Sequence, residues 1–257
     1  MSFKPKKSLG QHFLTDPNMI EKIVNALEAA NTDRIIEIGP GTGALTQLLL
    51  DRFEDVHAIE LDERAAEHLK EKFPDLVIHQ QDVMKVNWSE LKSETGATHV
   101  IGNLPYYITS PILFLLLSNR HLFEDALLMM QKEVAERLVA ETRTKAYGIL
   151  SVQTQLMSSV EILFDVSRHV FSPQPKVDSA MVRLTFDKGK LKCTEKHLKQ
   201  VVRTAFNQRR KKMSNALKPL IQKYKPENFD LSRRAEELPP EEYEMLTVHL
   251  EQNGILT

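Results

Sequence analysis

The stretch that most constrains the fold lies at residues 35–46, where an apolar run meets a cluster of glycines (IIEIGPGTGALT). The run is rich in β-branched residues, which predicts a buried strand. Leu45, Leu48, Leu49 and Phe53 then fall on one face of a helix. Strand, tight turn and helix open a doubly wound α/β sheet, and such sheets bind ligands at the carboxyl ends of their strands.

The glycine turn alone leaves three interpretations. Gly39-x-Gly41-x-x-Ala44 satisfies the loose dinucleotide fingerprint. Gly39-x-Gly41-x-Gly43 preceded by Glu37 resembles motif I of S-adenosylmethionine (SAM) methyltransferases instead. A strand–helix turn without any ligand is the third, because lone glycine patterns are weak signals.

Charge and cysteine content exclude several classes. The 257 residues carry a formal net charge of −1, so any nucleic-acid signal must be local. The single cysteine, Cys193, allows no disulfide framework and no cysteine metal cluster. The longest apolar run, residues 112–117, is too short to span a bilayer, which needs about 20 residues, and no signal peptide follows the basic N-terminus. We expect a cytoplasmic protein that uses no metal.

Two acidic residues follow predicted strands. Glu60 ends the strand at 56–61, about 20 residues beyond the glycines, where an acid accepts hydrogen bonds from ribose hydroxyls. Asp82 ends the strand at 76–82 and can accept from an adenine amino group or cap its loop. Asp62 is expected to cap the next helix.

Residues 98–107 help to distinguish a SAM-binding site from a dinucleotide-binding site. A fourth strand ends in Asn103-Leu104-Pro105-Tyr106, the form of motif IV in methyltransferases that act on exocyclic amines of nucleobases. Ser110 and Pro111 are expected to cap and begin the following helix. With this motif the glycine turn is better explained as SAM-binding than as dinucleotide-binding.

The remaining chain predicts strands at 127–130, 160–166 and 179–186, then a helical segment. We place the domain boundary after residue 188, giving a catalytic domain at 1–188 and a helical domain at 189–257. The latter concentrates cations that favour a phosphate-binding surface over a merely solvated face; they are Arg203, Arg209, Arg210, Lys211 and Lys212. Lys6 and Lys7 add a basic arm, and Asp16-Pro17 predicts the first helix.

Four motifs together resemble the ribosomal RNA adenine N6,N6-dimethyltransferases, most closely the bacterial small-subunit enzymes linked to kasugamycin sensitivity. They are SLGQHFL at 8–14, EIGPGTG at 37–43, NLPYY at 103–107 and FSPQPKVDS at 171–179. NQRRKK at 207–212 is similar to the small-subunit subgroup. The alternative within the family is the macrolide-resistance type, which modifies large-subunit RNA.

The resemblance implies a Rossmann-like catalytic domain with an antiparallel edge strand, and SAM as cofactor. It assigns SAM contacts to His12, Leu14, Glu37, Gly39, Gly41, Gly43, Glu60, Leu61, Asp82, Val83 and Asn103. It assigns the target base to Asn103, Pro105, Tyr106 and Phe171. Many members carry Asn where this chain has His12, so a side-chain contact there is in question, whereas a backbone contact would survive.

The implied partner is 16S rRNA in a pre-30S particle, modified at two adjacent adenines near its 3′ end by a monomeric enzyme. The Asn103 side chain and the Pro105 carbonyl would accept the two N6 protons. Two rival functions remain at this point: a dinucleotide-dependent oxidoreductase, and a largely non-catalytic ribosome-assembly factor.

Overall fold

The computed structural model describes residues 5–6 and 10–256, which form two compact units. The described residues up to 135, together with 161–186, form the first unit, and residues 136–160 and 187–256 form the second. The second unit therefore begins its C-terminal part close to the boundary expected after residue 188. It also takes in residues 136–160, which the sequence analysis placed with the catalytic domain, because α7 (Ile149–Met157) packs against the C-terminal helices.

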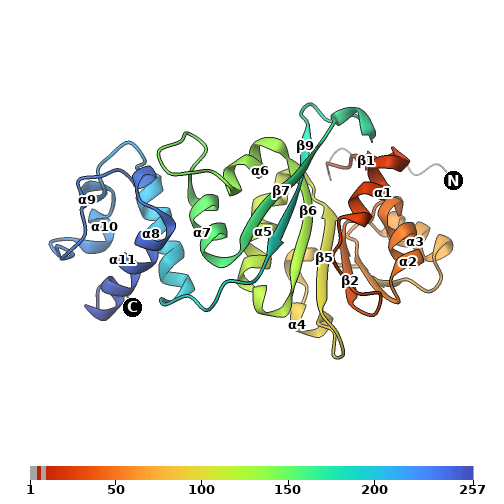
Figure 1. Ribbon diagram of the computed structural model, residues 1–257, viewed down its shortest axis with the longest axis horizontal. Helices are drawn as coiled ribbons and strands as arrows, with labels where there is room; N and C mark the ends of the chain where they lie inside the picture. The colour runs from red at the N-terminus through yellow and green to blue at the C-terminus, as the bar shows by residue number, and fades with distance from the viewer. Residues whose placement is uncertain (1–4, 7–9, 257) are drawn as a thin grey trace. The chain divides into compact units, whose positions relative to one another are not determined.

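The first unit is built on a seven-stranded sheet with the order β4-β3-β2-β5-β6-β9-β7 (Figure 1). Its parallel strands are β2 (Arg34–Ile38), β3 (Asp55–Ile59), β4 (Val77–His79), β5 (Thr98–Asn103) and β6 (Asp125–Gln131). β9 (Ser179–Thr185) pairs antiparallel with β6, and β7 (Ser159–Val166) lies at the edge. The chain runs outward from β2 and returns to β5, which creates a switch point between these two strands. The expected fold class is confirmed.

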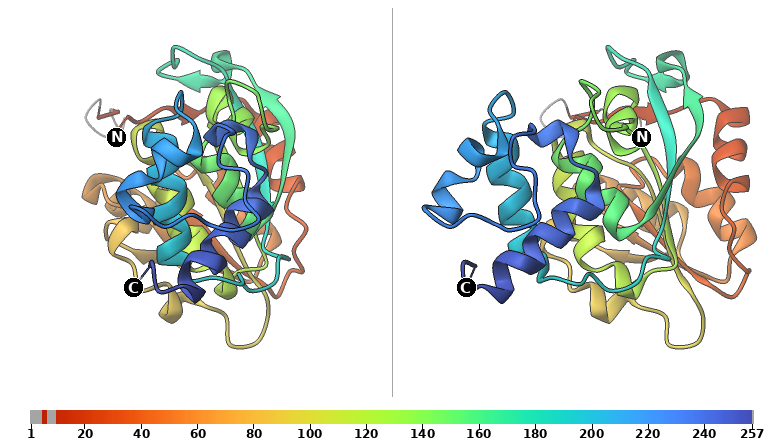
Figure 2. Two further views of the ribbon diagram at one scale, coloured as in Figure 1. Left: turned by 90° about the vertical axis from the view of Figure 1, so that its left-hand side faces the viewer. Right: turned by 60° about the vertical axis from the view of Figure 1, so that its left-hand side comes forward.

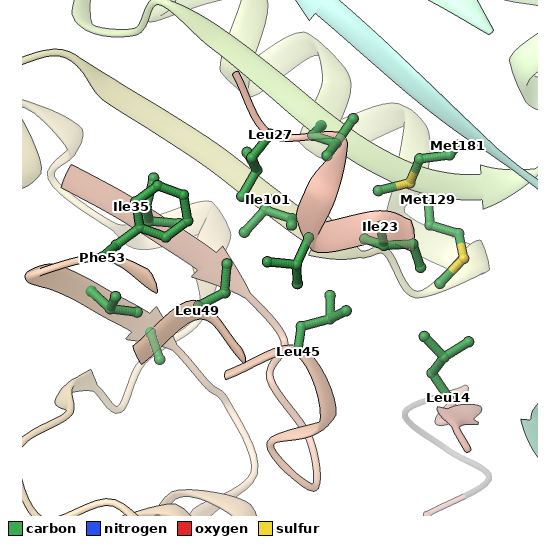
Figure 3. Close-up of a cluster of buried hydrophobic side chains, with 14 of the residues drawn as sticks. Leu14, Ile23, Leu27, Ile35, Leu45, Leu49, Phe53, Ile101, Met129 and Met181 are labelled. Atoms are coloured by element: carbon green, nitrogen blue, oxygen red, sulfur yellow. The ribbon is translucent and has the colours of Figure 1, made fainter. Parts of the chain in front are cut away.

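Helices cover both faces of this sheet (Figures 1 and 2). α1 (Pro17–Asn25), α2 (Ala44–Arg52) and α3 (Glu63–Lys72) share one buried cluster with the central strands. Figure 3 shows Ile23, Ile35, Leu49 and Ile101 within it, and each of them has no exposed surface. Burying such a side chain contributes roughly 1.5–3 kcal/mol. α4 (Trp88–Leu91) and α5 (Thr109–Ser118) also belong to this unit, and α6 (Lys132–Leu138) runs across the boundary after residue 135.

The starts of α1 and α5 test the helix caps that were predicted from local sequence. Asp16 caps α1 by accepting the Met19 N–H at 2.8 Å, with Pro17 as the first helical residue, as predicted. The α5 start was predicted wrongly: the helix begins at Thr109, before Ser110 and Pro111. The 3₁₀ turn η3 (Tyr106–Ile108) leads straight into it.

A second, two-stranded sheet was not foreseen. β1 (Phe13–Leu14) pairs antiparallel with β8 (Phe171–Ser172), so the segment near the N-terminus is attached to the loop that precedes β9. Two-residue strands carry almost no sequence pattern, which is why the pairing escaped prediction.

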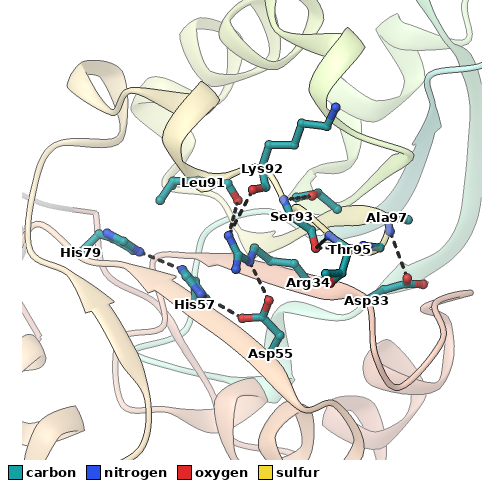
Figure 4. Close-up of polar contacts among 12 residues, drawn as sticks. Asp33, Arg34, Asp55, His57, His79, Leu91, Lys92, Ser93, Thr95 and Ala97 are labelled. Atoms are coloured by element: carbon teal, nitrogen blue, oxygen red, sulfur yellow. Dashed lines mark hydrogen bonds and ion pairs between the residues drawn. The ribbon is translucent and has the colours of Figure 1, made fainter.

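The beginnings of β2 and β3 are joined by ionic contacts (Figure 4). Arg34 Nε donates to the Asp55 carboxylate at 2.8 Å, and Arg34 Nη1 donates to the carbonyls of Leu91 and Lys92 at 3.2 Å each. The side chains at the amino ends of these strands are therefore engaged with one another, and the carboxyl ends are the place to look for a ligand site.

The second unit is helical. α7, α8 (Glu195–Asn207) and α11 (Pro240–Gln252) pack together, with α9 (Met213–Ala216) and α10 (Lys218–Ile221) beside α8. Among its described residues, Phe206 packs between Tyr147 and Tyr243, with ring centroids 6.1 and 6.0 Å away. Within the described part of the chain, no helix has the length and apolar content needed to cross a membrane.

Candidate functional site

A cavity lies at the carboxyl ends of β2, β3, β4 and β5, at the switch point of the sheet. Most of the predicted site residues line it: His12, Leu14, Glu37, Gly39, Gly41, Glu60, Leu61, Asp82, Val83, Asn103, Pro105 and Tyr106. Gly43 and Phe171 do not. Open α/β sheets bind ligands at this position. The strand ends and the family resemblance together therefore pointed to residues that line one cavity.

The glycine turn has a backbone that L-residues rarely adopt. Gly39, Gly41 and Gly43 have φ of 68°, 56° and 78°. A Cβ on Gly41 would lie 2.8 Å from the Phe13 ring, and one on Gly43 would lie 2.5 Å from the Phe73 ring. Gly43 therefore shapes the turn against α3, whereas Gly39 and Gly41 form part of the cavity wall.

Glu60 follows β3 and is 6% exposed. Its Oε1 accepts the Asp62 N–H at 2.8 Å, and its Oε2 accepts the Gly41 N–H at 3.2 Å. Burial raises the pKa of this carboxyl, although the same N–H groups counteract the shift. Each carboxylate oxygen can accept a further hydrogen bond, so Glu60 can hold two neighbouring hydroxyls.

Glu37 lies on β2 directly before the glycines and is 2% exposed. It accepts a hydrogen bond from the Thr46 hydroxyl of α2 at 2.6 Å. Burial raises the pKa of Glu37 to about 7, and the charge of Glu60 adds to this effect. Two desolvated acids at one end of the cavity favour a ligand with positive charge.

The β4 side of the cavity combines an apolar wall with an acceptor. Leu61 is 52% exposed and Val83 is buried. The Asp82 carboxylate accepts the Met84 N–H at 2.9 Å, which fixes its orientation at the start of a 3₁₀ turn. An apolar surface beside an oriented acceptor suits a flat heterocycle that carries an amino group.

Asn103, at the end of β5, is oriented by the N-terminal arm, which we define as residues 10–14. Its Nδ2 donates to the His12 carbonyl at 2.9 Å. A carbonyl can only accept, so the amide must present nitrogen to it, and Oδ1 is directed the other way. The His12 ring stacks on Tyr106, with centroids 5.7 Å apart. His12 thus contributes its backbone, as the departure from the family pattern allowed.

Tyr106 and Pro105 are held by neighbours. The Tyr106 hydroxyl is 2.8 Å from Ser179 Oγ, and burial raises the pKa of this phenol, so it stays neutral. The Pro105 carbonyl already accepts the Ile108 N–H and the Thr109 hydroxyl, both at 3.1 Å.

Phe171 does not lie at the cavity. It is 4% exposed and packs in the hydrophobic cluster beside Leu14, because β8 pairs with β1. Tyr107 lines the cavity instead, and it is 57% exposed. The sequence analysis gave this residue no role. Its position next to Tyr106 in the motif was the available signal.

The predicted cationic residues divide into two kinds. α8 ends at Asn207, so residues 208–212, expected within a helical domain, form a turn, named here the basic turn. Arg209 is engaged internally: Nε contacts Glu236 at 2.5 Å, and Nη1 and Nη2 donate to the Lys145 and Thr144 carbonyls at 2.8 Å each.

The other cations of this region are exposed, namely Arg203, Arg210, Lys211 and Lys212. Arg209 also joins the basic turn to Thr144 and Lys145. Lys145 and the neighbouring Arg143 are exposed and were not predicted. At the other end of the chain, Lys6 Nζ donates to Asp62 at 3.1 Å, and Lys7 lies outside the described residues. Among the residues described, none cluster as His, Cys, Asp or Glu ligands suited to a metal ion.

Comparison with known proteins shows the family. The matching family model, over residues 2–248, is described as ribosomal RNA adenine dimethylase. The ribosomal RNA small subunit methyltransferase A of Salinibacter ruber is 47% identical, over 98% of this chain and 87% of its own. That of Prosthecochloris aestuarii is 45% identical, over 94% and 92%.

Solved structures agree. A dimethyladenosine transferase from Plasmodium falciparum superposes with a TM-score of 0.78 at 28% identity, covering 95% of this chain and 98% of that one. A 23S rRNA methyltransferase, ErmE, superposes with a TM-score of 0.68 at 27% identity, covering 93% and 100%. The switch-point cavity, its acids and Asn103 thus occur in a chain that belongs to the ribosomal RNA adenine dimethylase family.

Proposed function

We propose that this protein uses SAM to dimethylate the N6 atoms of two adjacent adenines near the 3′ end of 16S rRNA. It would act as a cytoplasmic monomer on a pre-30S particle. The observation that carries the proposal is the oriented Asn103 amide at a cavity whose acids suit a cationic cosubstrate.

The cavity residues fit SAM. Glu60 would accept the ribose hydroxyls and Asp82 the adenine amino group, and Leu61 and Val83 would pack on the adenine; all four residues line the cavity. When bound, SAM supplies an electrophilic methyl group on a positively charged sulfur. The glycine turn lets the amino-acid half approach the backbone near Glu37.

A dinucleotide fits less well. A pyrophosphate at this turn would use backbone N–H groups as donors. The Gly41 N–H already donates to the Glu60 carboxylate, and Asp82 is a further acid in the cavity lining. These contacts favour SAM over NAD.

Asn103 would orient the nucleophile. The N6 lone pair of adenine is delocalised into its ring, so the amine must be aimed and favoured in its pyramidal form. Asn103 Oδ1 would accept a hydrogen bond from one N6–H group, and this would direct the N6 lone pair toward the methyl group. The Pro105 carbonyl would have to release the Thr109 hydroxyl before it accepts the second proton, so Asn103 carries most of this role. N6 becomes acidic as it is methylated, so no strong base is needed.

The target base must leave its stack to reach this cavity. Tyr106 and Tyr107 line the cavity and offer rings for stacking, which is worth about 1–3 kcal/mol per base. Phe171 is proposed to support this wall from the core rather than to touch the base.

Exposed cations of the second unit would bind RNA phosphates. Arg210, Lys211 and Lys212 in the basic turn, with Arg143 and Lys145 nearby in the same unit, offer positive charge, whereas Arg209 holds the two segments together. Phosphate contacts position the RNA without reading its sequence.

Small-subunit RNA is preferred over large-subunit RNA because the relatives at 45–47% identity are named small subunit methyltransferases. Mass spectrometry of both rRNAs, from cells with and without this protein, tests the proposal. The expected result is N6,N6-dimethyladenosine in 16S rRNA that disappears with the gene. Unchanged 16S rRNA would contradict it, and loss of the modification from 23S rRNA would favour the macrolide-resistance type.

A further inference from the structure

Asp62 occupies the N-cap position of α3 but does not cap the helix. Its side chain has no exposed surface, and its oxygens instead accept hydrogen bonds from Lys6, Gln11 and Arg64. The distances are 3.1 Å from Lys6 Nζ, 3.2 Å from Gln11 Nε2 and 2.7 Å from Arg64 Nη2. Residues at an N-cap usually accept a backbone N–H of the helix, whereas Asp62 binds side chains near the N-terminus of the chain. These contacts indicate a role other than helix capping.

The arm is anchored on both sides of the His12 carbonyl. On one side Gln11 bridges Asp62 and the Lys6 N–H, which donates to Gln11 Oε1 at 2.7 Å. On the other side the His12 Nδ1 donates to the Pro173 carbonyl at 2.7 Å, and β1 pairs with β8. Between these anchors lies the His12 carbonyl, which receives the Asn103 Nδ2.

We propose that Asp62 is a positioning residue that holds the arm across the cavity and thereby sets the orientation of the Asn103 amide. The inference rests on the proposed function of Asn103. It assigns to the arm a task besides cofactor contact: the carbonyl of His12 selects which end of the amide faces the target amine.

The charge of Asp62 suits this task. Hydrogen bonds from Arg64, Lys6 and Gln11 hold the pKa of this carboxyl well below its usual range, so the anchor stays ionised at any pH where the protein works. Phe13 adds to the attachment of the arm, because its ring lies against Gly41 and a Cβ on Gly41 would displace the ring.

Gln11→Glu tests the anchor because it replaces the donor to Asp62 with a second carboxylate of the same size. Arg64→Ala is the matched control, since it removes a partner of Asp62 that is not part of the arm. At saturating SAM and RNA we expect the single-turnover rate to fall at least tenfold in Gln11→Glu and Asp62→Ala, and to stay near wild type in Arg64→Ala. Equal rates in all four proteins would overturn the proposal.

A double-mutant cycle separates positioning from general loss of structure. If the arm acts through the Asn103 amide, Gln11→Glu should slow the enzyme little further once Asn103 is Ala. The same fold-reduction in both backgrounds would show that the arm acts by another route, and would overturn the inference. Failure of the proposed function itself is distinguishable, because Asn103→Ala alone would then retain the wild-type rate.

Discussion

The switch-point cavity of the first unit and the basic turn of the second use polar residues in opposite ways. Glu37 and Glu60 at the cavity and Asp62 beside it are buried, and each has hydrogen-bond partners. In the basic turn Arg210, Lys211 and Lys212 are exposed to solvent. The cavity fixes atoms in place, whereas the basic turn supplies charge.

This difference indicates a division of labour. Buried, hydrogen-bonded groups in a dry site are costly to desolvate, but they hold a reacting geometry. Exposed cations bind phosphates through long-range attraction that salt screens. Variants at the cavity should therefore change chemistry and cofactor binding, and variants in the basic turn should change RNA affinity.

Asn103→Ala should give the largest effect. Loss of one preorganised polar partner in a dry site costs about 10²–10³ in rate. The charge that develops here is positive and on nitrogen, so an acceptor takes the part that a donor plays for an oxyanion. We expect a folded protein with nearly normal RNA affinity whose single-turnover rate is at least about a hundredfold lower. A wild-type rate would remove Asn103 from the orienting role.

Glu37→Gln tests whether burial raises the pKa of the Glu37 carboxyl in the folded protein. Because the folded-state pKa is raised from 4.5 to about 7, the native state binds more protons, and the free energy of unfolding falls as pH rises through this window. At order of magnitude the decline is at most about 3 kcal/mol. Glutamine keeps an acceptor for Thr46 and should flatten the decline, whereas Glu67→Gln on the exposed face of α3 should not. Denaturant titrations from pH 4.5 to 8 give the answer, and parallel curves for wild type and Glu37→Gln would contradict the buried-acid account.

Glu60→Ala should weaken SAM binding and leave RNA affinity nearly unchanged. Hydrogen bonds to a charged acceptor contribute about 1.5–3 kcal/mol, or roughly ten- to a hundredfold in affinity. Isothermal titration calorimetry measures the change, with the melting temperature as a check on folding. Wild-type SAM affinity in this variant would exclude Glu60 from the ribose site.

Neutralising Arg210, Lys211 and Lys212 together should flatten the log–log salt dependence of RNA binding by about 0.7–0.9 for each phosphate that the variant no longer neutralises. SAM affinity should not change. Arg209→Gln is the matched control: it also removes one charge, but its guanidinium is engaged by Glu236 and two carbonyls. We expect a lower melting temperature with an unchanged salt slope for it. If the triple variant keeps the wild-type slope, the basic turn is only a solvated surface.

The sequence predicted the cavity better than the contacts around it. Glu60, Asp82 and Asn103 were found because each ends a strand, and parallel strand ends meet at one edge of a sheet. Phe171 was assigned to the base from the motif alone, and the unforeseen pairing of β1 with β8 places it in the core. Arg209 shows the same limit, since a cationic run does not reveal which member an internal acid and two carbonyls will engage.

The role of Asp62 also required the fold. Its position before a helix predicted a cap, but two of its side-chain partners, Lys6 and Gln11, lie more than 50 residues away in the chain. Contacts of this separation depend on how the arm crosses the cavity, which no local pattern encodes.

The single-turnover rate as a function of RNA concentration, at saturating SAM, tests the division of labour most directly. The Arg210, Lys211 and Lys212 triple variant should need more RNA but reach the wild-type plateau. Asn103→Ala should saturate at the wild-type RNA concentration and reach a plateau at least about a hundredfold lower. An Asn103→Ala plateau equal to wild type, or a triple-variant plateau lowered as far as that of Asn103→Ala, would contradict the account.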